Sequence, residues 1–134
     1  LAAALQLLLP GMPMIYYGDE VALEGGPDPD CRRGMLWDES RQNKEILKFY
    51  KTLIRIRHEY PVLMEGTLVK QYAEDSTGII YMERCLNGRS MIVVFHTREG
   101  NVELPELKGR KNLVDGQKFS GSLGDYETVV LVSC

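Results

Sequence analysis

The sequence predicts a mixed fold, in which a short α/β part is followed by an all-β antiparallel sandwich. Helical and buried-strand patterns fill the first sixty residues, whereas short β-type runs and turn signals fill the rest. Asn87-Gly88, between two such runs, is a strong hairpin signal. We therefore expect one structural part over residues 1–60 and a second over residues 61–134.

The sequence of residues 1–60 predicts a helix, a strand, a loop and a second helix, in that order. Leu1–Leu9 is rich in Ala and Leu and is followed by proline and glycine, which indicates a helix that ends there. Met14–Tyr17 is a continuous apolar run, typical of a strand buried on both faces in a parallel sheet. A polar loop over Asp19–Glu39 follows, and Asn43 then caps an amphipathic helix that stops before Pro61.

The sequence of residues 61–134 predicts several short strands with frequent turns. This pattern is typical of an antiparallel sandwich or barrel. The expected strands are Leu68–Ala73, Ile79–Leu86, Arg89–His96, Asn101–Leu104, Arg110–Val114, Gln117–Phe119 and Thr128–Val132.

Composition excludes several classes of function. Lys and Arg number 16 against 19 Asp and Glu, and a net charge of -3 argues against a nucleic-acid binder. The longest apolar stretch, Leu1–Met14, is interrupted by a glutamine, a proline and a glycine, so no membrane span is expected. Cys31, Cys85 and Cys134 form neither a disulfide framework nor a metal motif, which favours a reducing compartment such as the cytoplasm.

The loop from Asp19 to Trp37 carries most of the chemistry. Its carboxylates, guanidinium groups and aromatic rings suit a neutral polyhydroxylated ligand. Arg32 and Arg33 either contact such a ligand or neutralise Asp28 and Asp30 in a surface network. The two aspartates lack the remaining ligands of a calcium loop, so no metal is expected. The closing tryptophan is expected to anchor the following helix.

Three segments resemble one enzyme family. GMPMIYYGDE, residues 11–20, resembles the eighth-strand motif G-x-P-x-I-Y-Y-G-x-E of the α-amylase superfamily barrel. LEGGPDPDCRRGMLWDE is similar to the neopullulanase, cyclomaltodextrinase and maltogenic amylase branch, with Gly34 where a proline often stands. LIRIRHEYPVLMEG resembles the eighth barrel helix and its lead into the next domain. The resemblance implies the last β/α step of a (β/α)8 TIM barrel followed by the α-amylase C-terminal domain.

The resemblance also implies an activity for the parent protein and its absence here. Family members are retaining glycosidases that cleave α-1,4 links in maltooligosaccharides, cyclodextrins or pullulan. They need two carboxyl groups about 5–5.5 Å apart. These groups, and a third stabilising Asp, correspond to positions upstream of Leu1. We therefore expect no catalytic residue, no cofactor and no hydrolysis by this chain alone.

Substrate contact is what the resemblance assigns to this chain. In the family branch an Asp and an Arg four residues later hydrogen-bond a glucose on the non-reducing side of the cleavage point. Asp28 and Arg32 match them and are the expected substrate-binding residues. Tyr17, Gly18 and Glu20 are expected to support the site structurally, with Glu20 orienting the loop. The expected partner is an α-glucan oligosaccharide, with neither nucleic acid nor membrane.

Two further expectations concern the state of the chain. It opens at Leu1 inside a helical pattern, which favours a fragment of a longer protein. One strand cannot close a barrel, so exposed apolar surface would cause self-association, swapping or disorder before about Trp37. The alternative is a stand-alone carbohydrate-binding or structural β-sandwich module, which would show sugar affinity or mediate subunit contacts by itself.

Overall fold

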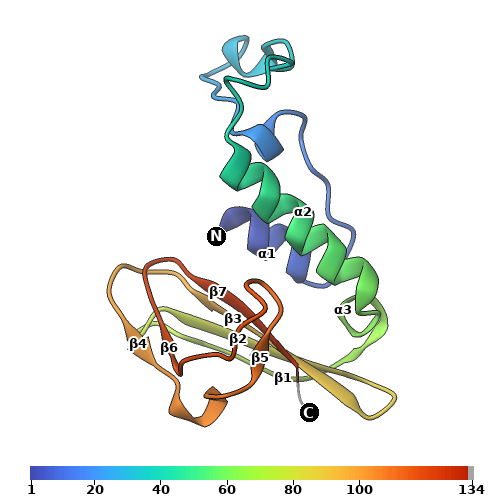
Figure 1. Ribbon diagram of the computed structural model, residues 1–134, viewed down its shortest axis with the longest axis vertical. Helices are drawn as coiled ribbons and strands as arrows, with labels where there is room; N and C mark the ends of the chain where they lie inside the picture. Colours follow the sequence, from blue (N-terminus) through green and yellow to red (C-terminus); the bar gives the residue numbers. More distant parts are fainter. Residues whose placement is uncertain (133–134) are drawn as a thin grey trace.

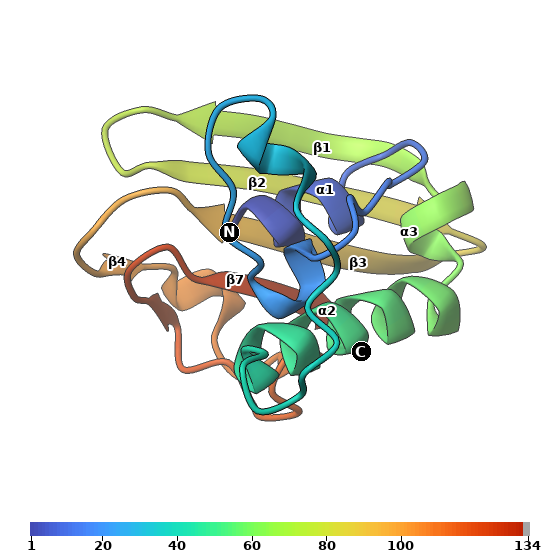
Figure 2. The same cartoon turned by 90° about the horizontal axis from the view of Figure 1, so that it is seen from above.

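A computed structural model describes residues 1–132 and shows a layer of helices resting on an antiparallel β-domain (Figure 1). Seen from above, α1 and α2 lie across one face of the strands (Figure 2). The β-domain predicted for the second half of the chain is confirmed. The helices are α1 (Ala2–Leu8), α2 (Lys44–Glu59) and α3 (Val62–Glu65), with 3-10 turns η1 (Asp19–Val21), η2 (Asp30–Arg32) and η3 (Pro105–Leu107). The strands are β1 (Thr67–Glu74), β2 (Ile79–Leu86), β3 (Arg89–His96), β4 (Val102–Glu103), β5 (Lys111–Asn112), β6 (Ser122–Leu123) and β7 (Thr128–Val132).

Helix α2 begins and ends where its sequence predicts. The Asn43 side chain accepts hydrogen bonds from the amides of Glu45 and Ile46, at 3.1 and 3.0 Å, and so satisfies two amide donors of the first turn. The helix ends at Tyr60 beside Pro61, after which the chain enters the short helix α3 that the sequence pattern did not indicate. The buried face of α2 is formed by Tyr50, Leu53, Ile56 and Arg57.

Arg57 joins α2 to the C-terminal end of α1. Its guanidinium donates to the carbonyl oxygens of Leu7 at 2.7 Å, Leu9 at 3.3 Å and Gly11 at 2.5 Å. Leu7 lies in the last turn of α1, and Leu9 and Gly11 follow the helix, so the buried guanidinium satisfies carbonyls at and just beyond the helix end and also complements the helix dipole. Arg57 therefore fixes where the chain leaves α1.

The five-stranded sheet has the order β1-β2-β3-β7-β5, and every neighbouring pair is antiparallel. Strands β2 and β3 pair along their whole lengths, from Leu86 opposite Arg89 to Ile79 opposite His96. Asn87 and Gly88 have φ angles of 51° and 77°, as the predicted tight hairpin requires. That hairpin is confirmed.

The two strands expected over Arg110–Val114 and Gln117–Phe119 are shorter than their pattern suggested. Residues 117–119 form no strand and contribute one isolated bridge, between Lys111 and Lys118. The two arms still exchange backbone hydrogen bonds, from Asn112 N to Gln117 O and from Phe119 N to Arg110 O, both at 2.8 Å. The Asn112 side-chain oxygen accepts from the amides of Val114 and of Val130 on β7, both at 3.2 Å. Strand β6, which was not expected, pairs with β4 to form a second, two-stranded sheet.

The sheet separates two apolar clusters. One lies between the sheet and the helices, and the other lies between the sheet and the loops around β4 and β6. Alternate residues of each strand supply the two faces, as the pleat requires. The helix-side cluster contains Leu7, Leu8, Leu53, Ile56, Leu63, Met82, Met91, Val93, Phe95 and Val130, so the helices and the sheet share one core.

Arg84, on β2, is the second buried arginine. Its guanidinium donates to Gly66 O from Nε at 3.0 Å and from Nη2 at 2.7 Å, and it also bonds Leu63 O. Burial and the nearby positive charge of Arg57 both lower the pKa of Arg84. This side chain ties the end of α3 to the sheet.

Met14–Tyr17 corrects one expectation. The segment is not a strand, and Met14 and Tyr16 are 72% and 49% exposed. A strand needs a neighbour to complete its backbone hydrogen bonds, and no strand of residues 1–132 pairs with this segment. The predicted eighth strand is therefore an extended, exposed connection in this structure, held at Met14 by the Gln6 amide, which donates to its carbonyl oxygen.

Two other points concern the described part of the chain. None of its helices has the length and apolar character needed to cross a bilayer. Cys31 and Cys85 are free thiols, and Cys134 lies outside the described residues.

Candidate functional site

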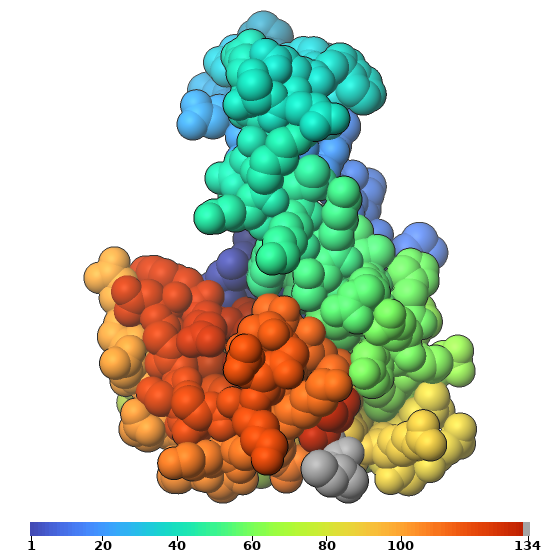
Figure 3. All heavy atoms as spheres, viewed as in Figure 1, coloured from blue at the N-terminus to red at the C-terminus, as the bar shows by residue number. Residues whose placement is uncertain are grey.

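The loop that the sequence singled out stands away from the core. Figure 3 shows the chain around residues 25–40 projecting above the helices and the β-domain. Its base is held near α2, because Asn43 N donates to Val21 O at 3.2 Å and Val21 is buried. The loop is thus a protrusion fixed at its root.

Asp28 and Arg32, the predicted substrate-binding residues, lie side by side at the outer part of this loop. Arg32 Nε is 2.8 Å from Asp28 Oδ1, and Arg32 Nη2 donates to Asp28 Oδ2 at 3.3 Å. The turn η2 between them brings the two side chains together across four residues. The two residues therefore neutralise one another, as one of the two alternatives expected. Their side chains are 61% and 70% exposed, so the pair is also open to solvent.

Asp30 and Arg33 form a second pair, interleaved with the first. Arg33 Nε and Nη2 donate to Asp30 Oδ1 and Oδ2, at 2.8 and 2.5 Å. This contact holds the pKa of Asp30 below its ordinary value and raises the pKa of Arg33. A Cβ at Gly26 would lie 2.8 Å from Asp30 Oδ2, so the second pair packs against bare backbone. The Asp30–Arg33 pair is therefore the less exposed of the two ion pairs, and the Asp28–Arg32 pair is the more exposed one.

The three expected support residues lie at the root of the loop. The Tyr17 hydroxyl donates to Arg33 O at 2.7 Å, and Gly18 N donates to Glu20 Oε2 at 2.9 Å. Gly18 has φ +95°, and a Cβ there would come within 2.6 Å of the Leu23 side chain, so glycine is required. The contact between Tyr17 and Arg33 was not foreseen, because a hydroxyl-to-carbonyl bond between residues sixteen apart leaves no trace in a sequence pattern.

Trp37 corrects another expectation. Its side chain is 80% exposed, so the prediction that it anchors α2 is wrong in this structure. The contact in this region is made by the neighbouring residue, because the carbonyl oxygen of Leu36 accepts a hydrogen bond from the side-chain amide of Gln42 at 2.8 Å. Within residues 1–132 no group of three or more His, Cys, Asp or Glu side chains is placed to hold a metal ion.

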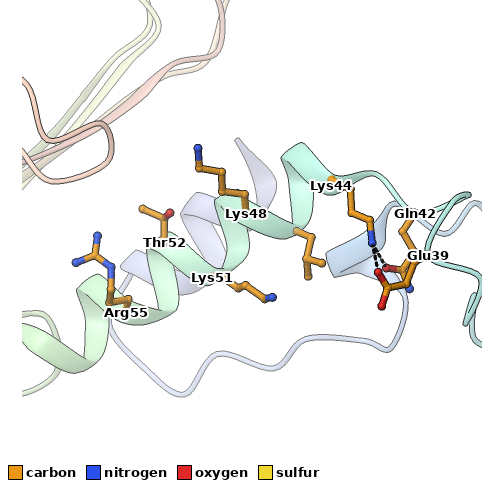
Figure 4. A pocket seen from close by; sticks show the side chains of 8 residues that line it. Glu39, Gln42, Lys44, Lys48, Lys51, Thr52 and Arg55 are labelled. Carbon is orange, nitrogen blue, oxygen red and sulfur yellow. Dashed lines mark hydrogen bonds and ion pairs between the residues drawn. The ribbon is translucent and has the colours of Figure 1, made fainter.

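A groove of about 540 Å³ runs along the exposed side of α2 (Figure 4). Two of its cations are paired, Lys44 with Glu39 at 3.1 Å and Arg55 with Glu59 at 2.8 Å. Lys48 and Lys51 point away from one another, so these cations do not converge on one anion. We interpret the groove as a solvated charged surface, and the loop remains the candidate site.

The chain is similar to several known glycosidases. The chain is 40% identical over 127 residues to a cyclomaltodextrinase of Thermoanaerobacter pseudethanolicus, and 35% identical over 133 residues to neopullulanase 2 of Thermoactinomyces vulgaris. These alignments cover 92% and 95% of this chain. A solved maltogenic amylase from S. marinus superposes on 98% of the chain with a TM-score of 0.86 and 28% identity. The chain is a homologue of these α-amylase-type glycosidases.

The glycosidase homologues are much longer than this chain. It spans 22% of the cyclomaltodextrinase, 23% of the neopullulanase and 19% of the maltogenic amylase. No family model matches the chain. The homology therefore shows that this chain corresponds to one part of an α-amylase-type glycosidase.

Proposed function

We propose that this chain is the C-terminal part of a retaining glycoside hydrolase that acts on α-1,4-glucans such as maltooligosaccharides, cyclodextrins or pullulan. Its role there is to supply a substrate-binding loop and a stabilising β-domain. The observation that carries the proposal is the paired Asp28 and Arg32 on a protruding loop of a cyclomaltodextrinase homologue. We place the parent enzyme in the cytoplasm, which the two free thiols support, as does a 40% identical Bacillus subtilis relative named intracellular maltogenic amylase.

We assign residues 1–60 to the end of the catalytic barrel and residues 61–134 to the C-terminal domain. The eighth-strand motif over residues 11–20 supports this assignment, together with the exposure of Met14, which a neighbouring barrel strand would cover. In the family the nucleophile and the acid precede this region, so the chain alone is proposed to be inactive. Incubation of the purified chain with maltotriose should release no glucose or maltose.

Asp28 and Arg32 are proposed to bind the same glucose unit of the substrate. A carboxylate accepts hydrogen bonds from sugar hydroxyls and a guanidinium donates them, so neighbouring hydroxyls of one pyranose match the two groups. The ion pair orients both side chains before the sugar arrives. Tyr17, Gly18 and Glu20 are proposed to support the loop, and the Tyr17 bond to the Arg33 carbonyl is the contact that supports this role.

The expected result in a full-length enzyme containing this chain is a loss of kcat/KM on maltotriose in Asp28→Ala and in Arg32→Ala. Each variant loses a charge-assisted hydrogen bond worth about 1.5–3 kcal/mol, which is roughly 10- to 150-fold. The double variant should cost little more than either single change, because the two groups act as one unit. Steady-state kinetics measure the effect.

Arg41→Ala is the matched control, since Arg41 is exposed nearby and lies outside the two loop pairs. Its kinetics should equal those of the unaltered enzyme. The thermal midpoint of all variants should stay nearly constant, because an exposed ion pair contributes little to stability. Unaltered kcat/KM in both Asp28→Ala and Arg32→Ala would refute the binding role.

The isolated chain is proposed to self-associate through the connection after α1. Met12 is 96% exposed and Met14 72%, next to the half-exposed Tyr16 and Tyr17. Adjacent apolar side chains of this kind favour association. Sedimentation velocity should show an average mass that rises with concentration, and Met12→Ser combined with Met14→Ser should lower it. A concentration-independent monomer would contradict this proposal.

A further inference from the structure

Tyr72 and Tyr81 form a stacked pair at the edge of the sheet, on the face away from the helices. Their ring centroids are 4.9 Å apart and their planes differ by 10°. They are direct cross-strand neighbours on β1 and β2. Tyr81 is 6% exposed and belongs to the second apolar cluster, whereas Tyr72 is 38% exposed. The buried ring therefore forms a firm backing for the exposed one.

The outer face of Tyr72, meaning the ring face turned away from Tyr81, lies at the open edge of the sheet. Strand β1 is the outermost strand, and within residues 1–132 only β2 pairs with it. Because the stacking direction runs from β2 to β1, one Tyr72 face lies on Tyr81 and the other lies on the side where no strand of residues 1–132 pairs. Lys70 Nζ is 5.5 Å from the Tyr72 centroid and 5.1 Å from that of Tyr81. A cation nearer to Tyr81 than to Tyr72 cannot lie over the outer face.

Polar groups flank this ring on both sides along the strand. Lys70 and Glu74 lie two residues before and after Tyr72, so both point to its face of the sheet, each about 7 Å away along the strand. Glu74 is held in place, because Thr77 Oγ1 donates to its Oε2 at 2.7 Å. An ammonium donor and a carboxylate acceptor therefore bracket a flat aromatic surface.

We propose that Tyr72, Lys70 and Glu74 form a saccharide contact on the β-domain. The C–H face of one pyranose would lie on the outer ring of Tyr72, and hydroxyls at its two ends would reach the ammonium and the carboxylate. The choice of an α-1,4-glucan as the saccharide rests on the proposed function. The contact itself rests on the ring, its backing and its two flanking charges.

Binding here is weak, because one exposed ring and two flanking side chains give few contacts. A maltotriose titration of the isotopically labelled 134-residue chain, followed by amide chemical shifts, should give a Kd of about 1 mM or weaker. The shifting amides should lie at residues 70–74 and 81–83. Tyr72→Phe keeps the flat face and should bind within about twofold of the original chain.

Tyr72→Ala removes the platform and should weaken binding at least about tenfold. Tyr72→Leu, which keeps an apolar cover on Tyr81 but has no flat face, should lose binding equally and carries the test if the alanine variant does not fold. Tyr126→Ala is the matched control, since Tyr126 is 48% exposed in the turn before β7. It should bind as the original chain does.

The proposal would be overturned by the absence of any shift at residues 70–74 up to about 20 mM maltotriose, by equal binding in Tyr72→Ala, or by equal loss in Tyr126→Ala. Shifts confined to residues 26–33 would also overturn it and would leave the proposed role of the Asp28 loop standing. The kinetic test of Asp28 and Arg32 has an independent outcome, so the two proposals fail separately.

Discussion

Arg57→Met should lower the free energy of unfolding by about 3 kcal/mol. Methionine keeps the apolar stem of the side chain but removes every bond to the carbonyls of Leu7, Leu9 and Gly11. The Leu7 carbonyl then stays buried without a partner, which costs more than the mean value of a hydrogen bond. Urea unfolding followed by circular dichroism measures the change.

Arg55→Met is the control for this prediction. Arg55 lies on the same helix, is 55% exposed and pairs with Glu59. Its loss should change the free energy of unfolding by less than about 0.5 kcal/mol. Arg57→Lys should recover part of the stability, because one ammonium reaches fewer carbonyls than a guanidinium. Equal effects of Arg55→Met and Arg57→Met would show that the buried contacts do not contribute.

Gly66→Ala should be the second strongly destabilising change, by about 3 kcal/mol. A Cβ at this position would collide with the carbonyl oxygen of Val62 and lie 2.8 Å from Val62 Cγ2 and 3.1 Å from Cys85 O. Two of these neighbours are backbone, so they cannot move aside as a flexible side chain would. The shift would also disturb Gly66 O, which accepts from Arg84.

Gly34→Ala tests the same substitution where there is room. No atom lies within 4 Å of the added Cβ at Gly34. The variant should be neutral, or more stable by up to about 1 kcal/mol, through the lower entropy of the unfolded chain. Differential scanning calorimetry of both variants separates the steric effect from the general effect of replacing glycine. A Tm for Gly66→Ala as high as that of Gly34→Ala would contradict the steric argument.

Local signals predicted those elements whose stabilising contacts are close in sequence. Asn43 caps α2 through its own side chain, and Asn87-Gly88 supplies the backbone angles of its hairpin, so each prediction needed only neighbouring residues. Met14–Tyr17 failed for the opposite reason. Its pattern is that of a buried strand, but a strand forms only beside a partner, and the described chain provides none.

In the candidate loop, contacts between residues close in sequence could be predicted, and contacts between distant residues could not. The motif around Asp28 and Arg32 identified the pair, and their spacing agrees with the observed ion pair. The brace from Tyr17 to Arg33, and the burial of Arg84, depend on contacts that span 16 or more residues. An arginine in a strand pattern is ordinarily assigned to solvent, because its burial requires acceptors that only the tertiary fold supplies.

The strand order has a consequence for the sequence of events during synthesis. Among residues 1–132, strand β5 joins the sheet only through β7, which also completes the hydrogen bonding of β3. A nascent polypeptide that has left the ribosome as far as Tyr126 therefore contains β1, β2 and β3 as a meander whose β3 edge still lacks its β7 partner, and β5 has no strand to pair with. Completion of the sheet waits for Thr128–Val132, and until then the β3 edge is open to pairing with other chains.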